Sequence, residues 1–135
     1  MFLQSVDLFA FCKAEEVLRI SVIARERSFE AGEKIYEVNR PAEDLYCVVR
    51  GSAKLESPDG NAWKVGPLGT FGVEEILSGR LRTSSATAET DTLVLSIGAE
   101  DFFDLLANNI DIVKGLFRQF LPASNLQSST QGVTQ

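Results

Sequence analysis

The central part of this chain is divided into pieces that are too short for helices. From Arg25 to about Ile97, glycine, proline and Asp/Asn turns leave pieces of about four to seven residues, a length typical of strands. Within several pieces apolar side chains alternate, as in strands with one buried face. The alternating sets are Leu45, Cys47 and Val49, then Ala53 and Leu55, and finally Leu93, Leu95 and Ile97. The pattern predicts a domain built mainly from short strands.

Two segments between the predicted strands carry turn residues. They are Arg50-Gly51 and residues 57–61, which read Ser-Pro-Asp-Gly-Asn. Glycine accepts a positive φ, and Asp and Asn side chains bond their own backbone. We expect a tight antiparallel hairpin at each segment.

Apolar residues return at helical spacing on both sides of the strand region. Residues 2–24 predict two short helices, and Glu15 and Glu16 lie at the start of the second, where acidic side chains favour the helix dipole. Helical spacing resumes after Gly98, and Pro122 ends the last helix. The fold class is therefore α+β.

The length and composition indicate one domain. With 135 residues, of which 44% are apolar, the chain can bury one core and cannot hold a second large domain. We assign the domain to residues 1–122, and a flexible C-terminal tail rich in Ser, Gln and Thr to residues 123–135. No apolar run approaches the roughly 20 residues of a membrane-spanning helix, and a signal peptide pattern is missing. We expect a cytoplasmic protein with no membrane-spanning segment.

Composition also excludes several kinds of chemistry. The chain has no histidine, which removes imidazole bases, Ser/His and Cys/His pairs and imidazole metal sites. An enzyme, for example on a cupin-like barrel, is therefore not expected, and neither is a metal or a cofactor. Cys12 and Cys47 are interpreted as buried free thiols in a reducing compartment, with a single bridge between them as the alternative. The net charge of -6 opposes direct nucleic-acid binding.

Residues 65–86 break the strand pattern and suit a small anion. A glycine turn ending at Gly72 precedes a short helical piece, Gly79 closes it, and Arg82 follows just ahead of hydroxyl side chains. Backbone N–H groups at a helix start and one guanidinium can together grip phosphate oxygens. The alternative is a surface turn with a solvated arginine.

Over most of its length, from about Leu3 to Leu121, the chain resembles the cyclic nucleotide-binding domain family. The matching stretches are SVDLF, RSFEAGEKIYEVNRPAEDLYCVVRGSAKLE, VGPLGTFGVEEILSGRLRTSSATAET and LVLSIGAEDFFDLLANN. The resemblance implies an antiparallel β-roll, of the jelly-roll type, flanked by N-terminal and C-terminal helices. It also implies a sensor that holds cyclic AMP or cyclic GMP inside the roll, and not an enzyme.

The resemblance also assigns residues to the ligand. Gly72 corresponds to the glycine whose backbone approaches the ligand, and Arg82 to the arginine that pairs with the cyclic phosphate. Thr83 stands where threonine can bond a guanine edge, which favours cyclic GMP, although cyclic AMP-responsive channels share the Arg-Thr pair. The last helix offers Phe117 or Phe120 as a lid, with ordinary core packing as the alternative. The implied ligand-binding residues are Gly72, Val73, Glu74, Arg82, Thr83 and Ser84.

Three residues depart from the family pattern: Val73, Glu75, and Leu68, which stands where a glycine is common. Val73 replaces the usual glutamate that accepts from the ribose 2'-hydroxyl. An unpaired buried hydroxyl would cost about 1 to 3 kcal/mol, or about 5- to 150-fold in affinity. Glu75 stands where a small residue is usual, beside the phosphate, and would repel the ligand if it pointed inward. A one-residue slip in the turn would instead let Glu74 take the missing role.

Two functions therefore remain open. One is a cyclic-nucleotide sensor module that acts on an effector domain in a longer parent protein, with a second copy of the chain as a further candidate partner. The other is a degenerate roll that binds no nucleotide and serves as a structural or protein-interaction module. In either case, without a ligand, Arg82 is expected to pair with Glu74 or Glu75.

Overall fold

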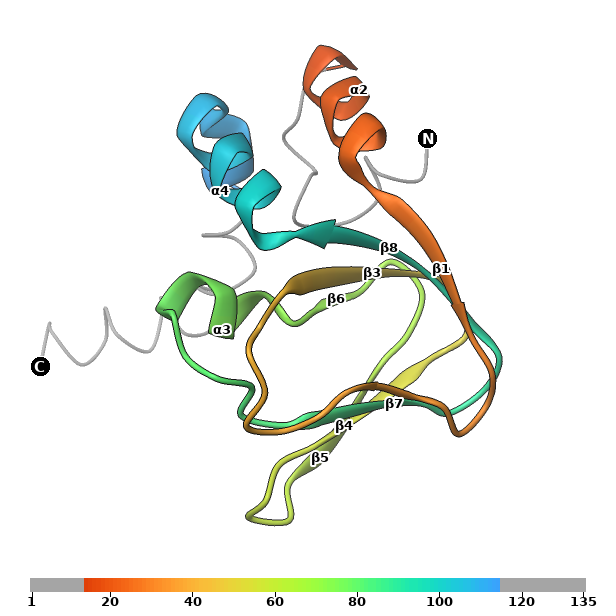
Figure 1. Ribbon diagram of the computed structural model, residues 1–135. Helices are drawn as coiled ribbons and strands as arrows, with labels where there is room; N and C mark the ends of the chain where they lie inside the picture. Colours follow the sequence, from red (N-terminus) through yellow and green to blue (C-terminus); the bar gives the residue numbers. More distant parts are fainter. Residues whose placement is uncertain (1–13, 115–135) are drawn as a thin grey trace, which may run out of the picture.

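The computed structural model describes residues 14–114, and these form two four-stranded antiparallel sheets that face each other (Figure 1). The first sheet contains, in order, β1 (Arg25–Phe29), β8 (Thr92–Gly98), β3 (Asp44–Arg50) and β6 (Thr70–Phe71). The second contains β2 (Lys34–Tyr36), β7 (Ser85–Ala88), β4 (Ala53–Glu56) and β5 (Ala62–Val65).

Helices flank this roll. Figure 1 shows α2 (Ala14–Ile23) and α4 (Ala99–Asn108) on the outer side of the first sheet, and α3 (Val73–Ser78) at one end of the roll. Residues 110–114 continue as a further helix. The predicted α+β fold, an antiparallel β-roll flanked by helices, is confirmed. The first predicted N-terminal helix and the tail at 123–135 lie outside the described residues.

The described residues build two hydrophobic cores, one on each side of the first sheet. One lies under the helices and includes Ile20, Leu45 and Phe102. The other lies inside the roll and includes Val48 and Leu55.

The expectation of one buried face is wrong for β3. Leu45 and Cys47 pack toward the helices, while Tyr46 and Val48 pack inside the roll. Both faces are buried because α2 and α4 cover the outer face of the first sheet. In β8 the most buried apolar residues are Val94 and Ile97, and Leu93 and Leu95 are only partly buried.

Of the two predicted hairpins, one is present. The segment at 57–61 joins β4 to β5, which pair directly. The Arg50-Gly51 segment does not form a hairpin, because β3 and β4 belong to different sheets. Gly51 has a φ of 90°, and a Cβ there would lie 2.5 Å from the carbonyl oxygen of Asp91. The glycine therefore forms a corner where the chain crosses between the sheets.

The start of β3 also anchors the start of α4. Asp44 lies opposite Gly98 in the sheet register. The Ala99 N–H, at the first turn of α4, donates to the carbonyl oxygen of Glu43 at 2.8 Å. The start of β3 and the start of α4 are therefore held side by side at one end of the two inner strands of the first sheet.

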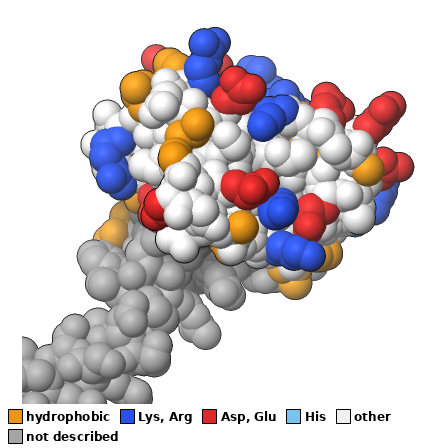
Figure 2. Space-filling model, turned by 90° about the horizontal axis from the view of Figure 1, so that it is seen from below, with side chains coloured by type: hydrophobic (Ala, Val, Ile, Leu, Met, Phe, Trp, Pro, Cys, Tyr) orange, Lys and Arg blue, Asp and Glu red, His pale blue; other side chains and the backbone are white. Residues whose placement is uncertain are grey.

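Charges of both signs are mixed on the surface of the second sheet. Lys54 pairs with Glu56 at 3.8 Å and Lys64 with Glu89 at 3.3 Å. Figure 2, seen from below the view of Figure 1, shows basic side chains lying among acidic ones on that face. Among the described helices, none has the length and apolar character needed to span a membrane.

Candidate functional site

The short helix α3 begins and ends at glycines in the left-handed conformation. Gly72 has a φ of 85° and Gly79 a φ of 68°, as expected for a helical piece enclosed by glycine turns. A Cβ at position 72 would lie 3.0 Å from Arg82 Nη1 and 3.2 Å from the Asp44 carbonyl oxygen. Glycine is therefore required both by the backbone angle and by the close approach to Arg82.

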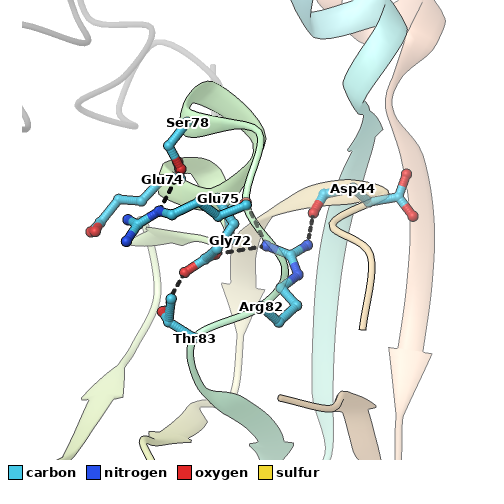
Figure 3. A network of polar contacts seen from close by, with 8 residues as sticks. Asp44, Gly72, Glu74, Glu75, Ser78, Arg82 and Thr83 are labelled. Atoms are coloured by element: carbon cyan, nitrogen blue, oxygen red, sulfur yellow. Dashed lines mark hydrogen bonds and ion pairs between the residues drawn. The ribbon is translucent and has the colours of Figure 1, made fainter. Parts of the chain in front are cut away.

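Arg82 is buried beneath this turn, with 2% of its surface exposed. Its Nη1 donates to the Gly72 carbonyl oxygen at 2.7 Å, and its Nη2 donates to the Asp44 carbonyl oxygen (Figure 3). The guanidinium also lies over the Tyr36 ring, with Cζ 4.0 Å from the centroid. Within the described part of the chain, Arg82 Nε has no hydrogen-bond partner. The alternative of a surface turn with a solvated arginine is wrong.

Glu75 is the acid that pairs with Arg82. Its Oε1 lies 3.0 Å from Arg82 Nη1, and its Oε2 accepts from the Thr83 hydroxyl at 2.7 Å. Glu75 is 6% exposed, whereas Glu74 is exposed and points away in Figure 3. Each carboxylate oxygen therefore has its own donor, and the pair is shielded from water.

These contacts lower the pKa of Glu75. Burial alone would raise the pKa, because it disfavours the charged form. The hydrogen bonds from Thr83 and Arg82, together with the positive charge of Arg82, outweigh burial and hold the pKa below its ordinary value. The carboxylate is therefore ionised at neutral pH and neutralises Arg82.

A cavity of about 140 Å³ lies beside this network. Its wall includes five of the six ligand-binding residues expected from the sequence, namely Gly72, Val73, Glu74, Thr83 and Ser84. Arg82 does not line the cavity and reaches it only through its contacts with Gly72 and Glu75. Arg82 instead borders a separate hollow of about 520 Å³.

The expected residues differ in what their side chains do. Val73 is 2% exposed and packs in the core under the helices, so its side chain contributes to folding as well as to the cavity wall. Ser84 is also 2% exposed. Phe117 and Phe120, the expected lid, lie outside the described residues.

The sequence did not reveal the aromatic side chains around the site. Tyr36, Tyr46 and Phe71 form a cluster inside the roll, with ring centroids 5.1 to 6.0 Å apart. Burial raises the pKa of Tyr36 despite the nearby Arg82, so the ring stays neutral. Strand β2, which carries Tyr36, has only three residues, too few for an alternation signal.

The described residues offer no metal site. No group of three or more Cys, Asp or Glu side chains in the range 14–114 is placed to hold a metal ion. The arrangement can instead bind an anion, because a buried guanidinium and a hydroxyl both donate toward one place. Glu75 occupies that place.

The two sheets form a roll with helices on one side, and a buried arginine lies beside a short helix bounded by glycines. Together these features define a β-roll domain flanked by helices. The family model of the cyclic nucleotide-binding domain matches residues 26–109 of the sequence. The chain therefore belongs to this family. Domains of this family are in general regulatory rather than catalytic.

Similarity to known proteins supports the assignment to this family. A cyclic nucleotide-gated potassium channel of Mesorhizobium japonicum is 29% identical over 115 residues, which cover 85% of this chain and 32% of the channel. The chain thus spans about a third of that relative's length. The N-terminal domain of a Streptomyces coelicolor transcriptional regulator is 26% identical, with a TM-score of 0.74 and coverage of 97% of this chain and 96% of that one.

A third similar protein shares the fold at lower identity. The regulatory subunit of a cAMP-independent protein kinase A from Trypanosoma brucei has a TM-score of 0.78 at 20% identity. The match covers 96% of this chain and 48% of the subunit.

Proposed function

We propose that this chain is a sensor module that binds cyclic AMP or cyclic GMP, with Arg82 pairing with the cyclic phosphate. The observation that carries the proposal is the buried Arg82–Glu75 pair beside the cavity. A buried guanidinium needs an anion. In the absence of a ligand, the carboxylate of Glu75 supplies one.

Binding requires Glu75 to move. A cavity of about 140 Å³ is close to the size that holds a single benzene ring, about 150 Å³, and is below the roughly 300 to 1,000 Å³ of small-molecule sites. A nucleotide therefore does not fit while Glu75 holds Arg82 and Thr83. Once Glu75 withdraws, both donors are free to bind phosphate oxygens.

The kinase subunit from Trypanosoma brucei supports this view of Glu75. That subunit is described as cAMP-independent, and a triple mutant of it is described with cAMP bound in the A site. One substitution removes a glutamate, and another introduces an arginine seven positions later. Glu75 and Arg82 have the same spacing here. By this spacing, the chain would have an arginine like the one introduced in the mutant while keeping a glutamate like the one removed.

The alternative function is a roll that binds no nucleotide and acts as a structural or interaction module. The observation that favours it is the pairing of Arg82 with protein oxygens, since Gly72, Glu75 and Asp44 already accept hydrogen bonds from its two terminal nitrogens. Val73, which has no acceptor for the ribose, also favours it.

Calorimetric titration with cyclic AMP and cyclic GMP separates the two functions. If the chain is a sensor, the unmodified chain should bind a cyclic nucleotide, and Arg82→Ala should bind it with at least tenfold lower affinity. The reason is that a hydrogen bond to a charged group contributes about 1.5 to 3 kcal/mol. Arg80→Ala is the matched control, because Arg80 is exposed and bonds only to the Ser78 side chain and the Glu75 carbonyl within the described residues. No binding of either nucleotide by the folded chain contradicts the sensor proposal and leaves the alternative.

We also propose that the regulated output resides in an effector domain elsewhere in a longer protein, because the related channel is about three times longer than the match.

The buried free thiol of Cys47 suits a reducing compartment such as the cytoplasm. Thr83 would bond a guanine edge, as in the cyclic GMP assignment, only after it releases Glu75.

A further inference from the structure

We propose that Trp63 is the surface on which the heterocyclic base of the ligand stacks. The inference rests on the proposed function and adds to it the residue that recognises the base. It starts from one unusual feature, an indole that faces the inside of the roll and is nevertheless 45% exposed.

The sheet register determines which way Trp63 faces. Trp63 lies directly opposite Leu55 in the β4–β5 pair, and opposite residues in an antiparallel pair project on the same side of the sheet. Leu55 is 3% exposed and belongs to the core inside the roll. Trp63 therefore points to the same side as the interior.

Trp63 is exposed because β5 is an edge strand. Within residues 14–114, β5 has β4 on one side in the second sheet and no further strand on the other. The indole thus leaves a large apolar surface partly open to water. Such a side chain gains free energy if a flat apolar group covers it.

The cavity connects Trp63 to the anion-binding groups. Its wall contains Trp63, Leu55 and Val65 from the β4–β5 hairpin, and Glu75 and Thr83 from the Arg82 network. One cavity thus has an apolar wall with an aromatic ring and a polar wall with two phosphate donors nearby. A cyclic nucleotide likewise has an aromatic base, which suits the apolar wall, and an anionic phosphate, which suits the polar wall.

Stacking on an exposed indole suits either purine base. Base–aromatic stacking depends on the π-face of the base and tolerates different bases. Trp63 would therefore contribute affinity for both cyclic AMP and cyclic GMP, and the choice between them would rest with polar groups such as Thr83.

The sequence provides a direct readout, because Trp63 is the only tryptophan of the chain. Intrinsic tryptophan fluorescence therefore reports on this residue alone. We expect cyclic AMP and cyclic GMP to change the fluorescence of the unmodified chain, with the same dissociation constant as calorimetry. Ribose 5-phosphate, which has a phosphate and no base, is the control ligand and should leave the fluorescence unchanged.

Three variants test the role of the ring. Trp63→Ala and Trp63→Leu should weaken binding by about 5- to 150-fold, the range for loss of one stacked base, while Trp63→Phe should retain most of the affinity. Phe103→Ala is the matched control, because Phe103 is 46% exposed and does not line the cavity. Circular dichroism checks that each variant is folded, and Trp63→Leu keeps the test valid if Trp63→Ala unfolds.

The outcomes separate this inference from the proposed function. If the unmodified chain binds a cyclic nucleotide with no change in its tryptophan fluorescence, and Trp63→Leu binds equally well by calorimetry, the stacking role is overturned and the sensor function stands. If the unmodified chain binds neither nucleotide, the sensor function fails and the stacking role fails with it.

Discussion

Removing the carboxylate of Glu75 should tighten cyclic-nucleotide binding. In the described structure Glu75 binds Arg82 at 3.0 Å and Thr83 at 2.7 Å, and a phosphate must break these contacts before it can replace them. A hydrogen bond to a charged group contributes about 1.5 to 3 kcal/mol. If one such contact is lost on binding, Glu75→Ala should bind about 10- to 150-fold more tightly.

The same substitution should destabilise the free domain. Glu75→Ala leaves the buried charge of Arg82 without its acid, and breaking a buried pair typically costs about 3 to 5 kcal/mol. The carbonyl oxygens of Gly72 and Asp44 still accept from Arg82, so we expect the lower end of that range. A saturating nucleotide should therefore raise the Tm of Glu75→Ala more than that of the unmodified chain.

Calorimetry and thermal unfolding of the unmodified chain, Glu75→Ala and Glu75→Gln measure both effects. Glu26→Gln is the matched control, because Glu26 is exposed and does not line the cavity; it should change affinity by about twofold at most. A folded Glu75→Ala variant that binds nucleotide no more tightly than the unmodified chain would refute the view that Glu75 competes with the phosphate.

Three further predictions follow from the contacts of the site. Because the contacts of Glu75 hold its pKa below the ordinary 4.5, they stabilise the fold above pH 4.5 and lose this effect as the pH falls through the lowered pKa. The Tm difference between the unmodified chain and Glu75→Gln should therefore be largest at pH 7 and disappear only in acid. A Tm difference that disappears near neutrality would contradict this. Burial raises the pKa of the Cys47 thiol to about 12, so in a Cys12→Ser background a thiol reagent should react only as fast as the domain unfolds, which rapid labelling of the native protein would disprove. Gly72→Ala forces a Cβ into a left-handed turn 3.0 Å from Arg82 Nη1, so denaturant unfolding should show a loss of stability of about 1 to 2 kcal/mol or more. Gly60→Ala, where φ is 95° and the surrounding space is open, should lose only the free energy needed to hold alanine at a positive φ.

Local chemistry made several elements predictable from the sequence. The glycines at 72 and 79 enclose α3 because each adopts a left-handed angle that other residues avoid. The turn residues at 57–61 place the β4–β5 hairpin. In both cases the signal lies within the segment that it shapes.

Other features depend on contacts between distant segments and carry no local signal. Arg50-Gly51 has the residue types of a hairpin turn, yet the chain crosses there from one sheet to the other and passes close to the backbone of Asp91. The choice of Glu75 over Glu74 as the partner of Arg82 depends on which face of α3 turns toward the loop after Gly79. Tyr36 reaches Arg82 only because β2 pairs with β7, next to the loop that carries the arginine.

The position of Arg82 also connects the short helix α3 to the start of α4. Its Nη2 restrains the main chain at Asp44, and the preceding carbonyl, that of Glu43, fastens the first turn of α4. The start of α4 is thus connected to the buried guanidinium through the single peptide unit between Glu43 and Asp44.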